Sequence, residues 1–195
     1  MTRALTPGEL LPLEHYARER AAIRGRMIGY RAARRLEVGP NCSWSFEDRE
    51  TVRYQVQEML RTERIFEPDG IAEELAAYNP LIPDGRNFKA TLLLEYPDPQ
   101  QRALRLQELR GIERHCWLQV SGHARVLAHA DEDLERENAD KTAAVHFLRF
   151  ELDPAMAASL KRGAALSAGI DLPAYAHTVD PVPDTLRAAL LADLD

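Results

Sequence analysis

A long uninterrupted helix in the first third of the chain constrains the fold more than any other segment. The run from Phe46 to Phe66, FEDRETVRYQVQEMLRTERIF, contains neither proline nor glycine and is rich in residues that favour helices. Ser45 or Asp48 is expected to cap its start, and Pro68 and Gly70 are expected to stop it. The sequence therefore predicts one helix over about 48–66.

The apolar residues of this helix form one stripe at 3.6 residues per turn, which predicts that the helix packs against the core. The stripe consists of Val52, Val56, Met59, Leu60 and Phe66. Glu63 falls inside the same stripe, so its carboxylate must reach an edge, bind a cation or shift its pKa. A neighbouring polar stripe predicts either a solvated helix edge or one wall of a cleft. It consists of Thr51, Gln55, Glu58 and Thr62.

Composition indicates a soluble globular protein. A chain of 195 residues with 45% hydrophobic and 29% charged residues is expected to form a single domain over 1–195. The formal net charge of −6 argues against nucleic-acid binding, and no apolar run approaches the ~20 residues of a membrane span. The N-terminus lacks a signal-peptide pattern, and the two cysteines, Cys42 and Cys116, fit a reducing compartment. These features together predict a cytoplasmic protein.

Proline, glycine and aspartate divide the rest of the chain into short elements. Helices are predicted over 14–35, 71–78, 98–111, 153–163 and 184–194. Strands are predicted over 36–46, 88–96 and 145–152, and a hairpin turning at Ser121-Gly122 over 116–128. The tail over 169–183 is predicted to be irregular because prolines interrupt it. The expected class is α+β, with a largely antiparallel sheet of about five strands packed around the central long helix.

Seven arginines make the predicted helix over 14–35 a local basic face in an acidic protein: Arg18, Arg20, Arg24, Arg26, Arg31, Arg34 and Arg35. Arg20, Arg24, Arg31 and Arg35 share one sector of the helical wheel. They either pair with acids elsewhere in the chain or form a docking face for an acidic partner or anionic ligand. The acidic segment 131–140 either balances them or is a solvated connection.

The loop over 79–87, NPLIPDGRN, is expected to be stiff, because two prolines fix its backbone and Asp84-Gly85 signals a tight turn. It either carries plain turn chemistry or presents polar side chains of a binding site, with candidates Asp84, Arg86, Asn87 and Lys89. Together with the long helix it predicts an enzyme site for a small anionic metabolite. The anion is expected to be held by Arg49, Arg86 and Lys89, with Gln55 beside it and Glu58 or Glu63 as general acid or base.

The common cofactor and catalytic motifs are absent, so no cofactor is predicted. A metal site using His115, His123 or His146 with carboxylates of the 131–140 segment is the third possibility. The expected hairpin register places His123, Arg125 and Leu127 on one face with Leu118, and His115 on the opposite face. His146 is expected on an apolar face that is typical of a core histidine.

Four segments of the chain resemble an uncharacterised bacterial family, a domain of unknown function. They are ELLPLEHY, FEDRETVRYQVQEMLRTERIF, ELAAYNPLIPDGRNFKATLLLEYPD and VHFLRFEL, and the match spans about Leu10 to Leu194. The resemblance implies that such proteins are encoded beside a rubrerythrin-like diiron protein and an iron–sulfur oxidoreductase similar to heterodisulfide reductase subunits. It carries over no catalytic residue. It therefore favours an accessory or binding protein of a redox system over the enzyme and the metal-binding protein.

Overall fold

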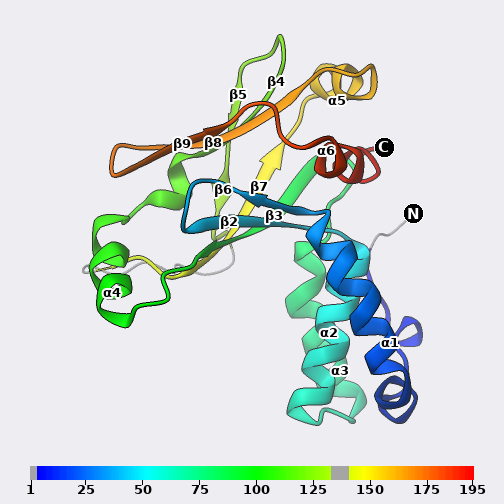
Figure 1. Cartoon of the computed structure of the whole chain (residues 1–195). Helices are drawn as coiled ribbons and strands as arrows, with labels where there is room; N and C mark the ends of the chain where they lie inside the picture. The colour runs from blue at the N-terminus through cyan, green and yellow to red at the C-terminus, as the bar shows by residue number, and fades with distance from the viewer. Residues whose placement is uncertain (1–3, 133–140) are drawn as a thin grey trace.

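Two antiparallel sheets dominate the computed structural model, which describes residues 4–132 and 141–195 (Figure 1). The first sheet has the order β1-β2-β3-β7-β6, with strands Arg35–Glu37, Cys42–Glu47, Asn87–Leu94, Val145–Glu151 and His129–Ala130. The second has the order β5-β4-β8-β9, with strands Arg125–Leu127, Cys116–Val120, Leu166–Leu172 and Tyr175–Val179. The predicted α+β class and antiparallel pairing are confirmed, but the strands form two sheets and not one.

The main core lies between the two sheets, because side chains alternate between the faces of each strand. The first sheet contributes Trp44, Phe46, Phe88, Leu92 and Phe150, and the second contributes Leu118, Val120, Ala168 and Ile170. The ring of Trp44 stacks on that of Phe150 with centroids 5.5 Å apart. The opposite face of the first sheet is more polar and carries Ser45, Glu47, Thr91, Lys89 and Arg149.

Three helices lie side by side as a layer at one end of the sheets (Figure 1). These are α1 (Leu13–Ala32), α2 (Arg49–Glu63) and α3 (Pro68–Tyr78), followed by the short helix η2 (Asn79–Leu81). A second apolar cluster lies in this layer and includes Val52, Val56, Leu60 and Leu75. The remaining helices are η1 (Pro7–Glu9), α4 (Pro99–Glu108), η3 (Ile112–His115), α5 (Pro154–Lys161) and α6 (Asp184–Leu191). Among the described residues, no helix combines the length and apolar character needed to cross a bilayer.

Helix α2 is the predicted long helix, but it ends at Glu63. Asp48 caps its start, because its Oδ1 accepts a hydrogen bond of 2.8 Å from the backbone N–H of Thr51. Arg64 takes the left-handed conformation with φ of 58°, and this residue ends the helix. Phe66 therefore leaves the apolar stripe and is 61% exposed, contrary to the expectation. Glu63 is exposed at the helix edge.

The tail over 169–183 is not irregular as expected, because much of it belongs to β8 and β9. Small residues and Gly169 weaken the strand signal of β8, yet this glycine is required by packing. A Cβ at Gly169 would lie 2.4 Å from Cζ2 of Trp117, whose indole covers the strand. The packing of Gly169 of β8 against Trp117 of β4 is a contact between distant segments, which the strand propensity of β8 alone does not reveal.

The hairpin of β4 and β5 is shifted by one residue from its expected register. Trp117 pairs with Leu127 and Gln119 with Arg125, so these four side chains share one face. The loop is longer than two residues, because Gly122 takes a positive φ of 83° and His123 donates its N–H to the carbonyl of Val120. The shift places the guanidinium of Arg125 3.8 Å above the ring of Trp117.

Candidate functional site on the first helix

Helix α1 exposes most of its surface, although it is the longest helix in the described residues. Tyr16 is its only buried side chain, and Ile23 and Met27 are half-buried against α2. Ile28 is 64% exposed on the opposite side. A 20-residue helix with so little burial is expected to gain stability when another surface covers it.

The outer face of α1 is built of small residues around Ile28. Ala21, Gly25 and Gly29 are all exposed, and a Cβ at either glycine would meet nothing within 4 Å. Arginines surround this face, and in the described part of the chain their guanidinium groups make no hydrogen bond or ion pair: Arg18, Arg24, Arg26 and Arg31. We call these four residues and the small face between them the α1 surface. It combines close backbone access with uncompensated positive charge.

The structure divides the four predicted docking arginines into two pairs. Arg24 and Arg31 belong to the α1 surface. Arg20 donates to Glu58 through Nε and Nη2 at 2.8 and 2.7 Å, and Arg35 binds Glu37 and Glu95 at 2.6 and 2.5 Å. Arg20 and Arg35 therefore serve contacts within the chain.

Glu58, a predicted acid or base, joins α1 to α2. Its Oε1 also accepts a hydrogen bond of 2.6 Å from the Tyr16 hydroxyl. The hydrogen bonds from Arg20 and Tyr16 hold the pKa of Glu58 below its ordinary value of 4.5. The ionised carboxylate holds α1 against α2 through its ion pair with Arg20. Because its pKa is lowered, it carries no proton to donate near neutral pH.

Replacing Glu58 by glutamine is expected to lower the free energy of unfolding by about 1 kcal/mol at pH 7. A carboxylate whose pKa is lowered in the folded state stabilises that state above its ordinary pKa, and loses this effect as the pH falls through the folded value. The difference between wild type and Glu58→Gln should therefore shrink at acid pH. Urea unfolding at pH 7 and at pH 3 measures it, with the exposed Glu63→Gln as the matched control. Equal stability of the Glu58 variant and wild type at pH 7 would contradict this assignment.

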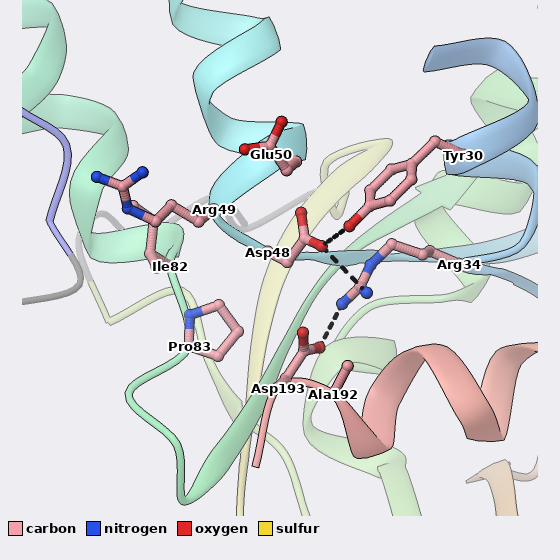
Figure 2. A pocket seen from close by; sticks show the side chains of 9 residues that line it. All are labelled: Tyr30, Arg34, Asp48, Arg49, Glu50, Ile82, Pro83, Ala192 and Asp193. Atoms are coloured by element: carbon pink, nitrogen blue, oxygen red, sulfur yellow. Dashed lines mark hydrogen bonds and ion pairs between the residues drawn. The ribbon is translucent and has the colours of Figure 1, made fainter. Parts of the chain in front are cut away.

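A cavity of about 390 Å³ lies where the C-terminal end of α1 meets the start of α2 and the segment after α6 (Figure 2). Arg34 lies at its base, only 3% exposed, between the carboxylates of Asp48 and Asp193. Its Nη1 is 3.1 Å from Asp48 Oδ2, and its Nη2 donates to Asp193. Tyr30 also donates its hydroxyl to Asp48, and burial raises the pKa of Tyr30 to about 12. The base of the cavity is therefore an internally paired charge cluster.

Arg34 also donates to the backbone carbonyls of Phe46, Glu47 and Ala189 at 3.1 to 3.3 Å. It thereby ties the helical layer to β2 and α6. The sequence does not distinguish Arg34 from the other arginines of the 14–35 segment, because one of its partners lies 159 positions away. No local pattern encodes such a contact.

The residues of the predicted enzyme site lie in separate places. Arg49 pairs with Glu9 and lines the cavity of Figure 2, whereas Lys89 lines a different cavity on the first sheet. Neither cavity is lined by Glu58 or Glu63. Gln55 lies near Tyr78 and lines neither cavity.

The predicted stiff loop mainly uses its polar groups for turn chemistry. Asp84 Oδ1 accepts from the N–H of Arg86 at 2.9 Å, and Asn87 Oδ1 accepts from the N–H of Asp84 at 3.2 Å. The Nδ2 of Asn87, which is buried, donates to Glu151 at 3.0 Å. Lys89, the predicted ligand-binding residue that follows the loop on β3, lines a cavity.

The three candidate metal ligands are also apart. His115 is exposed at the end of η3, while His123 hydrogen-bonds the Ser159 hydroxyl at 2.9 Å. His146 is fully buried, as expected of a core histidine, and hydrogen-bonds Thr142 and Asp131 at 2.8 and 2.6 Å. Over 4–132 and 141–195, no three His, Cys, Asp or Glu side chains are placed to hold a metal ion. Most acids of the predicted 131–140 segment lie outside the described residues: Asp133, Glu135, Glu137 and Asp140.

The comparisons with known proteins identify a family and give no activity. A family model described as "Protein of unknown function (DUF3501)" matches residues 4–194. A crystal structure of a novel protein of unknown function from Burkholderia pseudomallei K96243 is similar to this chain, with 50% identity and a TM-score of 0.91. The similarity covers 100% of both chains. No curated protein matches the sequence.

Proposed function

Because this chain belongs to the DUF3501 family, whose function is unknown, we propose from its surface that it is an accessory protein that docks an acidic partner through α1. The partner is a protein of a cytoplasmic redox system, either an iron–sulfur oxidoreductase or a rubrerythrin-like diiron protein. The choice of partner follows the gene neighbourhood that the family resemblance implies. The docking site follows from the chemistry of the α1 surface.

One observation carries the docking proposal: the α1 surface holds positive charge that the described part of the chain leaves uncompensated. Arg24 and Arg31 flank the small face of the helix on one side, in a protein of net charge −6. Uncompensated arginines at a rim steer an acidic partner and set its orientation. The exposed glycines at positions 25 and 29 allow a partner helix to approach the backbone closely.

Reversing two charges tests this docking. The double substitution Arg24→Glu and Arg31→Glu is expected to weaken partner binding by about tenfold or more at low salt, because repulsion replaces steering. The measurement is an anaerobic pull-down of the tagged protein from its native bacterium, with mass spectrometry of the captured proteins. Salt should release the partner from wild type, since exposed charge pairs are screened within about 10 Å at 0.1 M.

Arg86→Glu is the matched control, because Arg86 is also exposed but lies in the loop before β3. It is expected to leave capture unchanged. If the α1 double variant captures the iron–sulfur or rubrerythrin-like protein as well as wild type does, the docking face is wrong. If neither protein is captured by wild type, the redox assignment fails.

A further inference from the structure

A second cavity, of about 360 Å³, lies on the outer face of the first sheet beneath α3 and η2. This volume falls within the range of small-molecule sites in proteins. Exposed residues at its border, Ala77, Pro80, His129 and Glu132, leave it accessible from solvent. The cavity shares none of its lining residues with the α1 surface.

A row of ionisable side chains crosses the sheet beside this cavity. Glu47 of β2 pairs with Lys89 of β3, Lys89 pairs with Arg149 of β7, and Arg149 pairs with His129 of β6. Directly opposed residues in antiparallel strands lie on the same face with their Cβ atoms about 5 Å apart. All four also line the cavity. The sheet thus gathers four chemical groups from four strands at one place.

Two members of the row, Glu47 and Arg149, already have hydrogen-bond or ion-pair partners. The buried carboxylate of Glu47 accepts hydrogen bonds from the hydroxyls of Thr51 and Thr91, at 2.6 and 2.9 Å. Arg149 binds Glu132 through Nε and Nη2, both at 2.7 Å, and also donates to Glu151. These contacts raise the pKa of Arg149 and lower that of Glu132, so both remain charged and paired. Arg149 therefore holds Glu132 and Glu151, and among the described residues neither these two carboxylates nor that of Glu47 forms an ion pair with Lys89.

Lys89 lines the cavity, and its positive charge has no carboxylate partner among the described residues. Its Nζ donates to the carbonyls of Pro80 and Ile82 at 2.5 and 3.0 Å, which leaves one N–H for another acceptor. It forms no ion pair with a carboxylate of the described residues, and burial lowers its pKa. The imidazole of His129 also makes no hydrogen bond within the described part of the chain. A bound anion would offset the desolvation of the Lys89 ammonium.

The remaining lining is apolar and includes Ala77, Pro80, Leu81 and Phe147. We propose that this cavity is a binding site for a small carboxylic acid with an apolar body, whose carboxylate is held by Lys89 and His129. The apolar body lies along Leu81 and Phe147. This site is independent of the α1 surface, so its failure leaves the docking proposal untouched.

Phenylacetate is the probe, and 2-phenylethanol is its uncharged counterpart of similar shape. Two-dimensional amide NMR of the full chain should show phenylacetate shifting resonances of Ala77, Leu81 and Phe147. A dissociation constant on the order of 1 mM is expected for such a fragment. Lys89→Met should weaken binding by about tenfold or more, and 2-phenylethanol should bind at least about tenfold more weakly than phenylacetate.

Because Lys89 also holds η2, His129→Gln provides a second variant at an exposed position that should fold normally. It is expected to weaken phenylacetate binding about twofold to fivefold. Arg86→Met, a charge removal outside the cavity, should leave binding unchanged. The site is overturned if phenylacetate shifts no resonance of the cavity at about 10 mM. It is also overturned if the alcohol binds equally well, or if Lys89→Met and His129→Gln both bind like wild type.

Discussion

Replacing Arg34 by alanine is expected to lower the free energy of unfolding by about 3–5 kcal/mol, because the change removes one partner of a buried ion pair. Asp48 and Asp193 would then face each other with no guanidinium between them. Three backbone carbonyls would also lose a donor. For a chain of this length the melting temperature should fall by roughly 6–20 °C, measurable by calorimetry.

Arg31→Ala is the matched control, since Arg31 lies one turn earlier and is exposed without a partner in the described residues. Its effect should stay within about 0.5 kcal/mol. Adding Asp193→Ala to Arg34→Ala should restore part of the lost stability, because it removes one of the two opposed carboxylates. If Arg34→Ala had the same melting temperature as wild type, the charge cluster at the base of the cavity would contribute nothing to stability.

Replacing Trp44 by alanine is expected to cost about 3–5 kcal/mol, because it opens a cavity in the main core. Trp44 is fully buried on β2, where it stacks on Phe150 and meets the edge of Phe46 at a centroid distance of 6.4 Å. Both sheets depend on this position, since strands of the second sheet pack over the same core. Denaturant unfolding measures the loss as a lower midpoint with an unchanged slope.

Two further variants test whether the loss of stability comes from the hole that Trp44→Ala leaves in the main core. Trp44→Phe keeps an aromatic ring against Phe150, so its loss should be smaller than that of alanine. Phe66→Ala removes an aromatic ring that is 61% exposed, and it should change stability by less than about 0.5 kcal/mol. Equal losses for Trp44→Ala and Phe66→Ala would mean that burial on β2 does not decide the stability.

Local signals predicted much of the fold. Asp48 caps α2 as expected, because a cap depends on residues within one turn. The central position of β3 also followed from its own apolar run, and β3 does lie between β2 and β7. Features that depend on residues close together in the sequence, such as this cap and this strand, could be predicted from the sequence pattern alone.

Contacts between distant segments account for what the pattern missed. Gly169 weakens the strand signal of β8, and its requirement becomes visible only once the Trp117 indole lies against it. The register of the β4–β5 hairpin depended on the conformation of Gly122, and a shift of one residue moved Arg125 to the other face. Phe66 left the predicted stripe because one left-handed residue, Arg64, ends the helix before it.

The candidate sites were predictable to a smaller extent. The arginine-rich helix was visible in the sequence, but which arginines are free depended on partners such as Glu58 and Glu95. Lys89 was a candidate from its place beside the stiff loop, whereas Arg149 and His129 come from strands later in the chain and carried no motif. The pairing of β3 with β7 and of β7 with β6 brings the three residues together.

The pairing of the two sheets also fixes an order of events during synthesis. The strands that carry Trp44, Phe46 and Phe88 emerge from the ribosome long before β8, which helps to cover them. At about 5–20 residues per second, roughly 6–25 s separate the synthesis of Phe46 from that of the end of β8. During that interval the aromatic face of the first sheet has no native cover from β8 or α6. Early release of the nascent chain should therefore favour aggregation, and chaperones that bind aromatic strands should engage this protein before its second sheet is complete.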